Sequence, residues 1–313
     1  MIGHRLRAAF DWFFRRHRRK TLGAIVLLVI TYSMCLPRPL FRTPVSTVLE
    51  DRRGELLGAR IAADGQWRFP PLDSVPPRFV AAIIEFEDRR FYRHPGIDPL
   101  ALGRALWQNL RAGRIVSGGS TISMQVIRLA RGPRARNLFN KLIEAILATR
   151  LELERSKEAV LALYASHAPF GGNVVGLEAA AWRYYGKRPA QLSWGEAATL
   201  AVLPNSPALI HPGRNRGALL AKRDRLLDRL LDRGRLDSLD WRLARAEALP
   251  EAPLPLPRLA PHLLDQARVE YAADRFRSTL ERSLQQQLNA VIERHHRRLR
   301  HNEIHNLAAL IIE

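Results

Sequence analysis

From Pro76 onward, the sequence is a succession of helix-length segments in which apolar residues recur every three or four positions. Prolines, glycines and capping residues separate these segments. The one that follows Asp98-Pro99 and stops at Gly113 shows both boundary signals, because proline favours the first helical turn and glycine the position after the last. Similar segments follow at 120–203, 214–233 and 238–248. The pattern predicts a mainly α-helical fold.

The stretch before Pro76 has a different pattern. Two short β-type runs flank the turn sequence Asp51-Arg52-Arg53-Gly54, which predicts a small β-hairpin within residues 37–75. We place the main helical domain at 76–248. Beyond it, 249–305 combines a proline-rich linker with a long basic helix at 278–300, and 306–313 is a strand-like apolar run. A chain seldom stops within a strand, so we expect a further domain to begin there.

The N-terminal segment has the pattern of a membrane anchor. Residues 1–20 are strongly basic, and 21–36 contain no charged residue. A bilayer core needs about 20 apolar residues, so this run is slightly short unless Lys20 and Arg38 extend toward the interface or the bilayer thins. A cleaved or lipoprotein signal is disfavoured because bulky residues precede Cys35. We predict a cytoplasmic tail at 1–20 and an uncleaved transmembrane signal anchor at 21–36.

Composition limits the partners. The formal net charge of +20 attracts polyanions such as nucleic acid, anionic lipid headgroups or phosphorylated substrates. The basic residues are spread along the chain without zinc-finger spacing or an aromatic RNA-binding motif, so we predict no nucleic acid partner. Cys35 is the only cysteine, which excludes an intrachain disulfide and a cysteine metal site.

Four stretches carry side chains that are capable of catalysis or ligand binding. In Ala81–Asp98, an apolar run leads into several acids and a histidine; alone, this pattern is more typical of a solvated ion-pair face, such as Glu85 with Arg89. In Val116–Gln125, a glycine pair precedes a helix start, which is either an anion site or an ordinary capped helix. The GK[ST] ending of a phosphate-binding Walker loop is absent.

The third stretch is 137–154. Lys141 and Glu144 lie three residues apart and therefore share a helix face. Glu144 stands within an otherwise apolar row, and the periodicity does not separate an exposed carboxylate from an inward functional one. His167, in a fourth stretch at 164–187, precedes a glycine loop, where a lone histidine is usually structural.

Taken together and in this order, the stretches resemble the glycosyltransferase family 51 domain, the peptidoglycan polymerase of class A penicillin-binding proteins. The matching segments are EDRRFYRHPG (87–96), GGSTISMQ (118–125), KLIE (141–144), 156–187 and 192–212. Met124 and the sequence HAPFGG are most similar to the penicillin-binding protein 1C type. The run at 306–313 is similar to the opening strand of the transpeptidase domain, although no Ser-x-x-Lys or Lys-Thr-Gly motif occurs in this sequence.

The resemblance implies a lysozyme-like glycosyltransferase domain that polymerises lipid II at the periplasmic face of the inner membrane. Glu87 matches the general base and Glu144 the second glutamate of the family. The resemblance places substrate-binding residues at Asp88, His94, Ser120, Thr121, Gln125, Arg128 and Lys141. The resemblance implies no required cofactor. It leaves open whether a divalent cation, Mg²⁺ or Mn²⁺, binds, with Glu144 as a ligand. Expected partners are lipid II, the growing glycan strand, inner-membrane lipid and cell-wall synthesis proteins.

Two positions depart from the family pattern. Asn140 stands where arginine is usual, which removes a cation that Arg134 or Arg136 would have to replace. Ser166 stands where asparagine is usual, which changes a helix-to-loop hydrogen bond. Two rival functions stay open. One is a lytic glycosidase on a lysozyme-like scaffold, which would shorten glycan; the other is a non-catalytic, membrane-tethered scaffold that binds lipid II without polymerising it.

Overall fold

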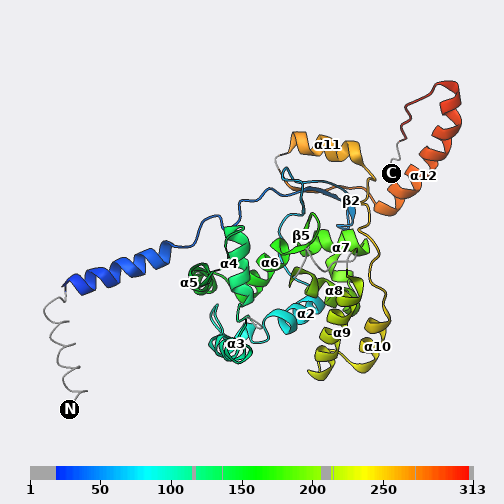
Figure 1. Ribbon diagram of the computed structural model, residues 1–313. Coiled ribbons are helices and arrows are strands. Elements are labelled where there is room, and N and C mark those ends of the chain that lie inside the picture. The colour runs from blue at the N-terminus through cyan, green and yellow to red at the C-terminus, as the bar shows by residue number, and fades with distance from the viewer. Residues whose placement is uncertain are drawn as a thin grey trace, which may run out of the picture. The chain divides into compact units, whose positions relative to one another are not determined.

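A computed structural model describes residues 19–114, 118–135, 137–205, 213, 215–271 and 273–309 (Figure 1). The chain forms two compact units. One comprises residues 1–42 and 94–156, and the other comprises residues 43–93 and 157–313. Each is described separately below. The prediction of a mainly helical protein is confirmed in both.

The regular secondary structure described in the first unit consists of helices joined by loops. Its elements are a helix over residues 19–34, α3 (Pro99–Ala112), α4 (Ile122–Arg131) and α5 (Leu138–Glu154). Side-chain caps start the last three: Asp98 accepts from the Ala101 N–H, Thr121 from the Met124 N–H and Asn137 from the Asn140 N–H. Each bond satisfies a backbone donor that a helix start leaves without an intrahelical acceptor.

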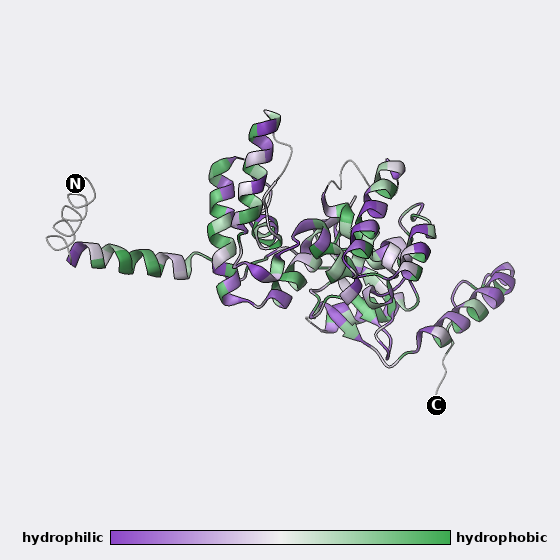
Figure 2. Cartoon of the chain, turned by 90° about the horizontal axis from the view of Figure 1, so that it is seen from below, coloured by the Kyte–Doolittle hydropathy of each residue, from purple (hydrophilic) through white to green (hydrophobic). Residues whose placement is uncertain are grey.

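The helix over residues 19–34 is attached to α5 at its C-terminal end. The Tyr32 hydroxyl lies 2.9 Å from the Thr149 hydroxyl, and the Arg150 guanidinium donates to the Ser33 carbonyl. Most of this helix is apolar (Figure 2). In the part of the chain that the structure describes, however, we find no helix both long enough and apolar enough to span a bilayer. A helix thus occupies most of the predicted anchor segment at 21–36.

The second unit begins with the predicted hairpin, which is confirmed. Strands β1 (Thr47–Glu50) and β2 (Leu56–Arg60) pair antiparallel. Asp51 closes the turn by accepting from the Arg53 and Glu55 N–H groups, and Gly54 takes the positive φ that the turn needs. Burial raises the pKa of Asp51, but these backbone donors and that of Arg282 outweigh burial and hold the pKa below its ordinary value.

A third strand completes this sheet from the far end of the chain. β6 (Arg275–Arg277) pairs parallel with β1, so the strand order is β2-β1-β6. A second small sheet joins β3 (Trp67–Arg68), β5 (Val174–Val175) and β4 (Pro169–Gly171) in the order β3-β5-β4. Neither β6 nor the second sheet is predicted from sequence, because each strand has only two or three residues and pairs with a distant segment.

The helices of the second unit surround α8 (Trp194–Val202), which packs against α2 (Pro77–Glu87), α7 (Leu177–Tyr185), α9 (Arg216–Asp232) and α10 (Ser238–Ala246) (Figure 1). Small residues on α8 allow this close packing. A Cβ atom on Gly195 would lie 2.7 Å from the Ala244 carbonyl oxygen, so a larger residue does not fit. Ser193 and Glu196 form a capping box that starts the helix.

The remaining elements of the second unit are short or lie toward its C-terminal end. They are η1 (Phe91–Arg93), α6 (Lys157–His167), η2 (Pro189–Gln191), η3 (Leu203–Asn205), α11 (Pro261–Glu270), α12 (Arg282–Leu299) and η4 (Arg300–Asn302). The predicted basic helix at 278–300 corresponds to α12, none of whose residues is buried. The predicted strand at 306–313 falls partly outside the described residues, and 306–309 form no strand.

Candidate active site

The first candidate stretch begins where α2 ends. Glu87 is the last residue of α2, and Asp88 follows in a non-helical conformation that stops the helix. Pro95 and Gly96 then turn the chain. A Cβ on Gly96 would lie 2.6 Å from the Ala148 carbonyl oxygen, and the Thr121 hydroxyl donates to the Gly96 carbonyl at 2.6 Å. This turn therefore needs glycine, which explains the Pro-Gly pair of the motif.

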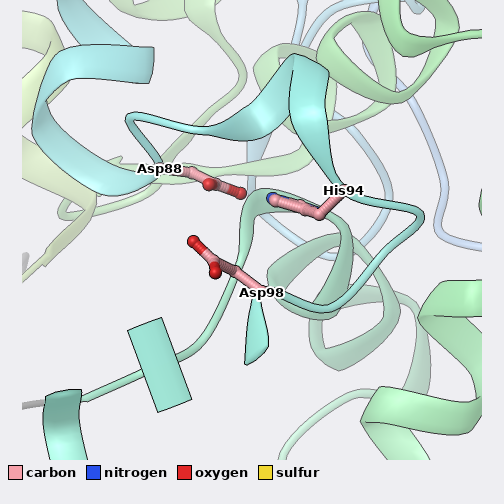
Figure 3. A group of neighbouring side chains, drawn as sticks. All are labelled: Asp88, His94 and Asp98. Atoms are coloured by element: carbon pink, nitrogen blue, oxygen red, sulfur yellow. The ribbon is translucent and has the colours of Figure 1, made fainter. Parts of the chain in front are cut away.

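Within this stretch, the side chains of Asp88, His94 and Asp98 converge (Figure 3). All three are buried, and one ligand atom of each lies within 4.8 Å of those of the other two. Two carboxylates and an imidazole suit a divalent cation. All three, however, take part in interactions within the protein, and Asp98 also caps α3. The cluster is thus explained as a buried polar network that fixes this turn.

Glu87 lies within electrostatic reach of two residues from other helices of its unit. Burial raises the pKa of Tyr164 on α6 well above its ordinary value, and the negative charge of Glu87 adds to the shift. The Tyr164 hydroxyl has no hydrogen-bond partner among the described residues. On α9, burial lowers the pKa of Lys222, and Glu87 opposes this shift. The Lys222 amine donates to the Asn205 amide oxygen at 3.1 Å.

The neighbouring acid Glu85 has a different role. It forms the predicted pair with Arg89, at 3.5 Å. Phe91, which follows in η1, is fully buried under the Lys157 ammonium group. Tyr92 remains exposed.

The second and third stretches meet within the first unit, because α4 packs against α5. Arg128 on α4 donates to both carboxylate oxygens of Glu144 on α5, with a shortest distance of 2.7 Å. Glu144 is only 7% exposed, so it is inward, and its ion pair is formed with Arg128 rather than with Lys141. Since a guanidinium already binds both oxygens, a metal ion at Glu144 would have to displace it, and the site does not fit the metal that the sequence left open.

The glycine loop at 118–121 precedes α4, the helix that carries Arg128 of this ion pair. Thr121 caps α4, and the Arg128 guanidinium lies 3.4 Å from the Ser120 hydroxyl. Gln125 is half-buried on the same helix, and its N–H bonds the Thr121 carbonyl. Lys141 is half-buried and forms no ion pair within the described residues. The loop, α4 and α5 thus gather polar and cationic groups on one unit.

Comparison with known proteins agrees with this arrangement of motifs. The family described as Transglycosylase matches residues 54–231. The chain belongs to this family. The match includes Glu87, the loop at 118–121, Lys141 and Glu144.

Relatives of this transglycosylase include penicillin-binding proteins. Penicillin-binding protein 1C of Escherichia coli is 38% identical over 82% of this chain and 33% of its own length. Penicillin-binding protein 1A of Aquifex aeolicus is 37% identical over 68% of this chain and 30% of its own length. A crystal structure of penicillin-binding protein 1A from Haemophilus influenzae matches with a TM-score of 0.38 and 18% identity, over 73% of this chain and 25% of that one. The chain thus spans about a third or less of these relatives, and the predicted family is confirmed.

The transglycosylase departs from the usual motifs at Asn140, and the structure shows what contacts it. Arg131 donates to the Asn140 side-chain oxygen at 3.1 Å. Arg134 and Arg136 were the predicted replacements for the missing cation; Arg134 is exposed, and Arg136 lies outside the described residues. The second departure, Ser166, is buried and accepts from the Leu72 N–H at 3.0 Å. A helix-to-loop hydrogen bond therefore exists at this position.

The predicted site residues of the transglycosylase divide between the two units. Glu87 and Asp88 belong to one, and His94, Ser120, Thr121, Gln125, Arg128, Lys141 and Glu144 belong to the other. Three residues of interest were not predicted from the sequence: Arg131, Tyr164 and Lys222. Tyr164 resembles a core residue in an apolar helix, and Lys222 is one of many charged residues on α9. The local sequence therefore marks neither of them as a site residue. His167 is buried, which agrees with its predicted structural role.

Proposed function

We propose that this transglycosylase polymerises lipid II into β-1,4-linked glycan strands for the cell wall and releases undecaprenyl pyrophosphate. The observation that carries the proposal is the family match over residues 54–231, because it includes both the carboxylate of Glu87 and the cationic surface of α4 and α5. The chemistry requires a group of each kind: a base for a hydroxyl nucleophile and positive charge for a pyrophosphate leaving group.

In the proposed reaction, the 4-hydroxyl of the acceptor's N-acetylglucosamine attacks the anomeric carbon of the chain's terminal N-acetylmuramic acid. The bond from that carbon to the pyrophosphate oxygen breaks, and the configuration inverts. Glu87 accepts the hydroxyl proton. Undecaprenyl pyrophosphate leaves with the bonding electron pair. A hydroxyl is a poor nucleophile at neutral pH, so a positioned carboxylate lowers the barrier by accepting its proton in the transition state.

Two side chains of the same unit lie within electrostatic reach of Glu87. Tyr164 on α6 is fully buried, and Lys222 on α9 carries a positive charge that attracts the Glu87 carboxylate. A nearby cation stabilises the negative charge of a carboxylate.

The leaving pyrophosphate would be neutralised by side chains of the first unit. Lys141 has no carboxylate partner among the described residues, and the Ser120 loop precedes the N-terminus of α4. The bidentate pair with Glu144 orients Arg128 toward Ser120. We assign the neutralising charge to these groups rather than to Mg²⁺ or Mn²⁺ at Glu144, because the carboxylate is already bound to a guanidinium.

The first test compares lipid II polymerisation by residues 1–313 with that of Glu87→Gln and Glu85→Gln. We expect glycan from the wild type and a loss of at least about a hundredfold in rate for Glu87→Gln, because general base catalysis typically contributes 10²–10⁴-fold. The control Glu85→Gln removes the same charge from the same helix and should retain most activity.

Product analysis separates the rivals. Shortened glycan would indicate a lytic glycosidase, and lipid II binding without any polymer would indicate a scaffold. The hydrogen bonds at Asn140 and Ser166 give the scaffold function no support, since both positions are integrated into the fold. Equal activity of Glu87→Gln and the wild type would exclude Glu87 as the base.

The same proposal includes a location. Lipid II is anchored in the inner membrane, so the enzyme would act at its periplasmic face, beside membrane lipid and other cell-wall synthesis proteins. Exposed apolar residues of the first unit support contact with lipid. They lie on the helix over residues 19–34, on α3 and on α5, and include Leu27, Leu28, Leu106, Trp107, Leu110, Phe139 and Leu142.

A further inference from the structure

The cationic residues of α4 and α5 differ in what balances their charge. Arg128 forms a bidentate ion pair with the buried carboxylate of Glu144. Arg131 lies three residues further along α4 and therefore on a neighbouring part of the same helix face. Within the described residues, Arg131 forms no ion pair with any carboxylate. No carboxylate of the described residues thus pairs with Arg131, whereas Glu144 pairs with Arg128.

Asn140 holds the Arg131 guanidinium through neutral acceptors. The Nη2 atom of Arg131 donates to the Asn140 side-chain oxygen at 3.1 Å, and its Nη1 atom to the Asn140 backbone carbonyl at 3.5 Å. These bonds orient the guanidinium and leave its charge intact. The other N–H groups of the fork remain available to a ligand, and a planar fork of this kind suits phosphate oxygens.

Asn140 is itself fixed by its surroundings. Its side-chain NH₂ donates to the Ala135 carbonyl at 2.9 Å, so the amide oxygen is directed to Arg131. Its backbone N–H donates to the side chain of Asn137, the residue that caps α5. Arg131 is therefore positioned from α5, one residue before Lys141, which also lacks an ion pair among the described residues.

We propose that Arg131, positioned by Asn140, is a ligand-binding residue for the pyrophosphate group of a polyprenyl-linked substrate. The inference rests on the proposed function, because that function supplies the pyrophosphate. It names a residue that the family motif does not contain and gives Asn140 the role of orienting it. Arg131 would bind oxygens of the leaving group together with Lys141.

The test uses residues 1–313 in detergent, with farnesyl pyrophosphate as the binding probe and lipid II as the substrate. Arg131→Gln removes the charge and retains a polar side chain. We expect it to weaken farnesyl pyrophosphate binding by roughly ten- to a hundredfold, the range for a lost hydrogen-bonded charge. The KM for lipid II should rise more than kcat falls. The matched control Arg104→Gln removes an exposed charge from α3 and should bind like the wild type.

Two further variants separate binding from folding. Asn140→Arg in the Arg131→Gln background places a guanidinium beside the lost one and should restore most of the binding. Asn140→Ala keeps the positive charge of Arg131 but removes the side-chain oxygen that orients its guanidinium. Binding of farnesyl pyrophosphate should therefore weaken severalfold with no loss of net charge. Thermal unfolding midpoints of all variants report whether they fold, and Asn140→Ala tests the inference even where Arg131→Gln does not fold.

The outcomes distinguish this inference from the proposed function. If the wild type polymerises lipid II and Arg131→Gln binds the probe as Arg104→Gln does, the inference is overturned while the function stands. If binding depends on Arg131 but the wild type makes no glycan, the function fails and the pyrophosphate site stands. Failure of Asn140→Arg to restore binding in a folded protein would also overturn the assignment.

Discussion

At the scale of single residues, burial sets the protonation of His167. The side chain is 9% exposed, and burial, assisted by the positive charge of Arg68, lowers its pKa from 6.5 to about 4. The folded protein therefore keeps this imidazole neutral at pH values where the unfolded chain binds a proton. Stability attributable to His167 is complete above about pH 6.5 and is lost as the pH falls toward 4.

We predict that the free energy of unfolding falls by up to about 3 kcal/mol from this residue between pH 6.5 and pH 4, given about 1.4 kcal/mol for each pKa unit. His167→Gln, which does not titrate, should flatten the pH dependence in that window. Urea denaturation at pH 7 and at pH 4.5 measures the difference. His305→Gln removes an exposed histidine and should leave the pH dependence as it is; the same slope in His167→Gln and the wild type would contradict the prediction.

At the scale of elements, the sequence predicts what is encoded locally. Asp98-Pro99 and Gly113 delimit α3 as predicted, and the hairpin around Asp51 forms because its turn residues provide their own hydrogen bonds. Pairings between distant segments have no local pattern, so β6, whose residue Arg275 lies opposite Val48, was not predicted. Arg131 was missed for the same reason. Its partner Asn140 lies on the next helix, across a loop that the helical periodicity does not describe.

The β1–β6 pairing depends on one buried ion cluster. Arg275 on β6 forms ion pairs with Glu50 on β1 and with Glu178 on α7, the latter at 2.7 Å. Both acids are largely buried, so removal of the guanidinium leaves Glu178 without the cation that pairs with it and leaves Glu50 with only the more distant Arg277, at 3.9 Å. Breaking a buried pair costs roughly 3–5 kcal/mol. Because 32% of the Arg275 side chain is exposed, we expect a smaller loss, of about 2 kcal/mol.

We therefore predict that Arg275→Gln lowers the free energy of unfolding by about 2 kcal/mol and exposes the segment after residue 270 to protease. Denaturant unfolding and limited proteolysis measure the two effects. Arg277→Gln is the matched control, since this arginine is 68% exposed and lies 3.9 Å from Glu50. The double variant Arg275→Gln with Glu50→Gln should recover part of the loss. Equal effects of the two single arginine variants would show that the cluster does not hold β6.

At the scale of the whole molecule, net charge and exposed apolar area favour the same partner. The chain carries a formal charge of +20, and its first unit exposes large apolar side chains on three helices. Positive charge attracts an anionic lipid surface over about 10 Å at ordinary ionic strength, and apolar side chains then enter the interface. Sequence composition predicted the charge effect, but the exposed apolar residues of α3 became evident only from the structure, because their spacing is that of a buried helix face.

We predict that residues 1–313 bind vesicles that contain phosphatidylglycerol, and that Leu106→Glu with Leu110→Glu weakens binding at least about tenfold, since each inserted leucine contributes roughly 1.5–3 kcal/mol when fully buried. Leu106 is 62% and Leu110 is 73% exposed, so the substitutions should leave the fold intact. Leu239→Glu, at a position of α10 that is 58% exposed, controls for the added negative charge. Flotation at low and high salt separates the two contributions: high salt should weaken binding of the wild type, and the α3 variant should stay the weaker binder at either salt concentration. If Leu239→Glu reduced binding as much as the α3 variant, charge alone would account for the attraction and α3 would have no part in the contact with lipid.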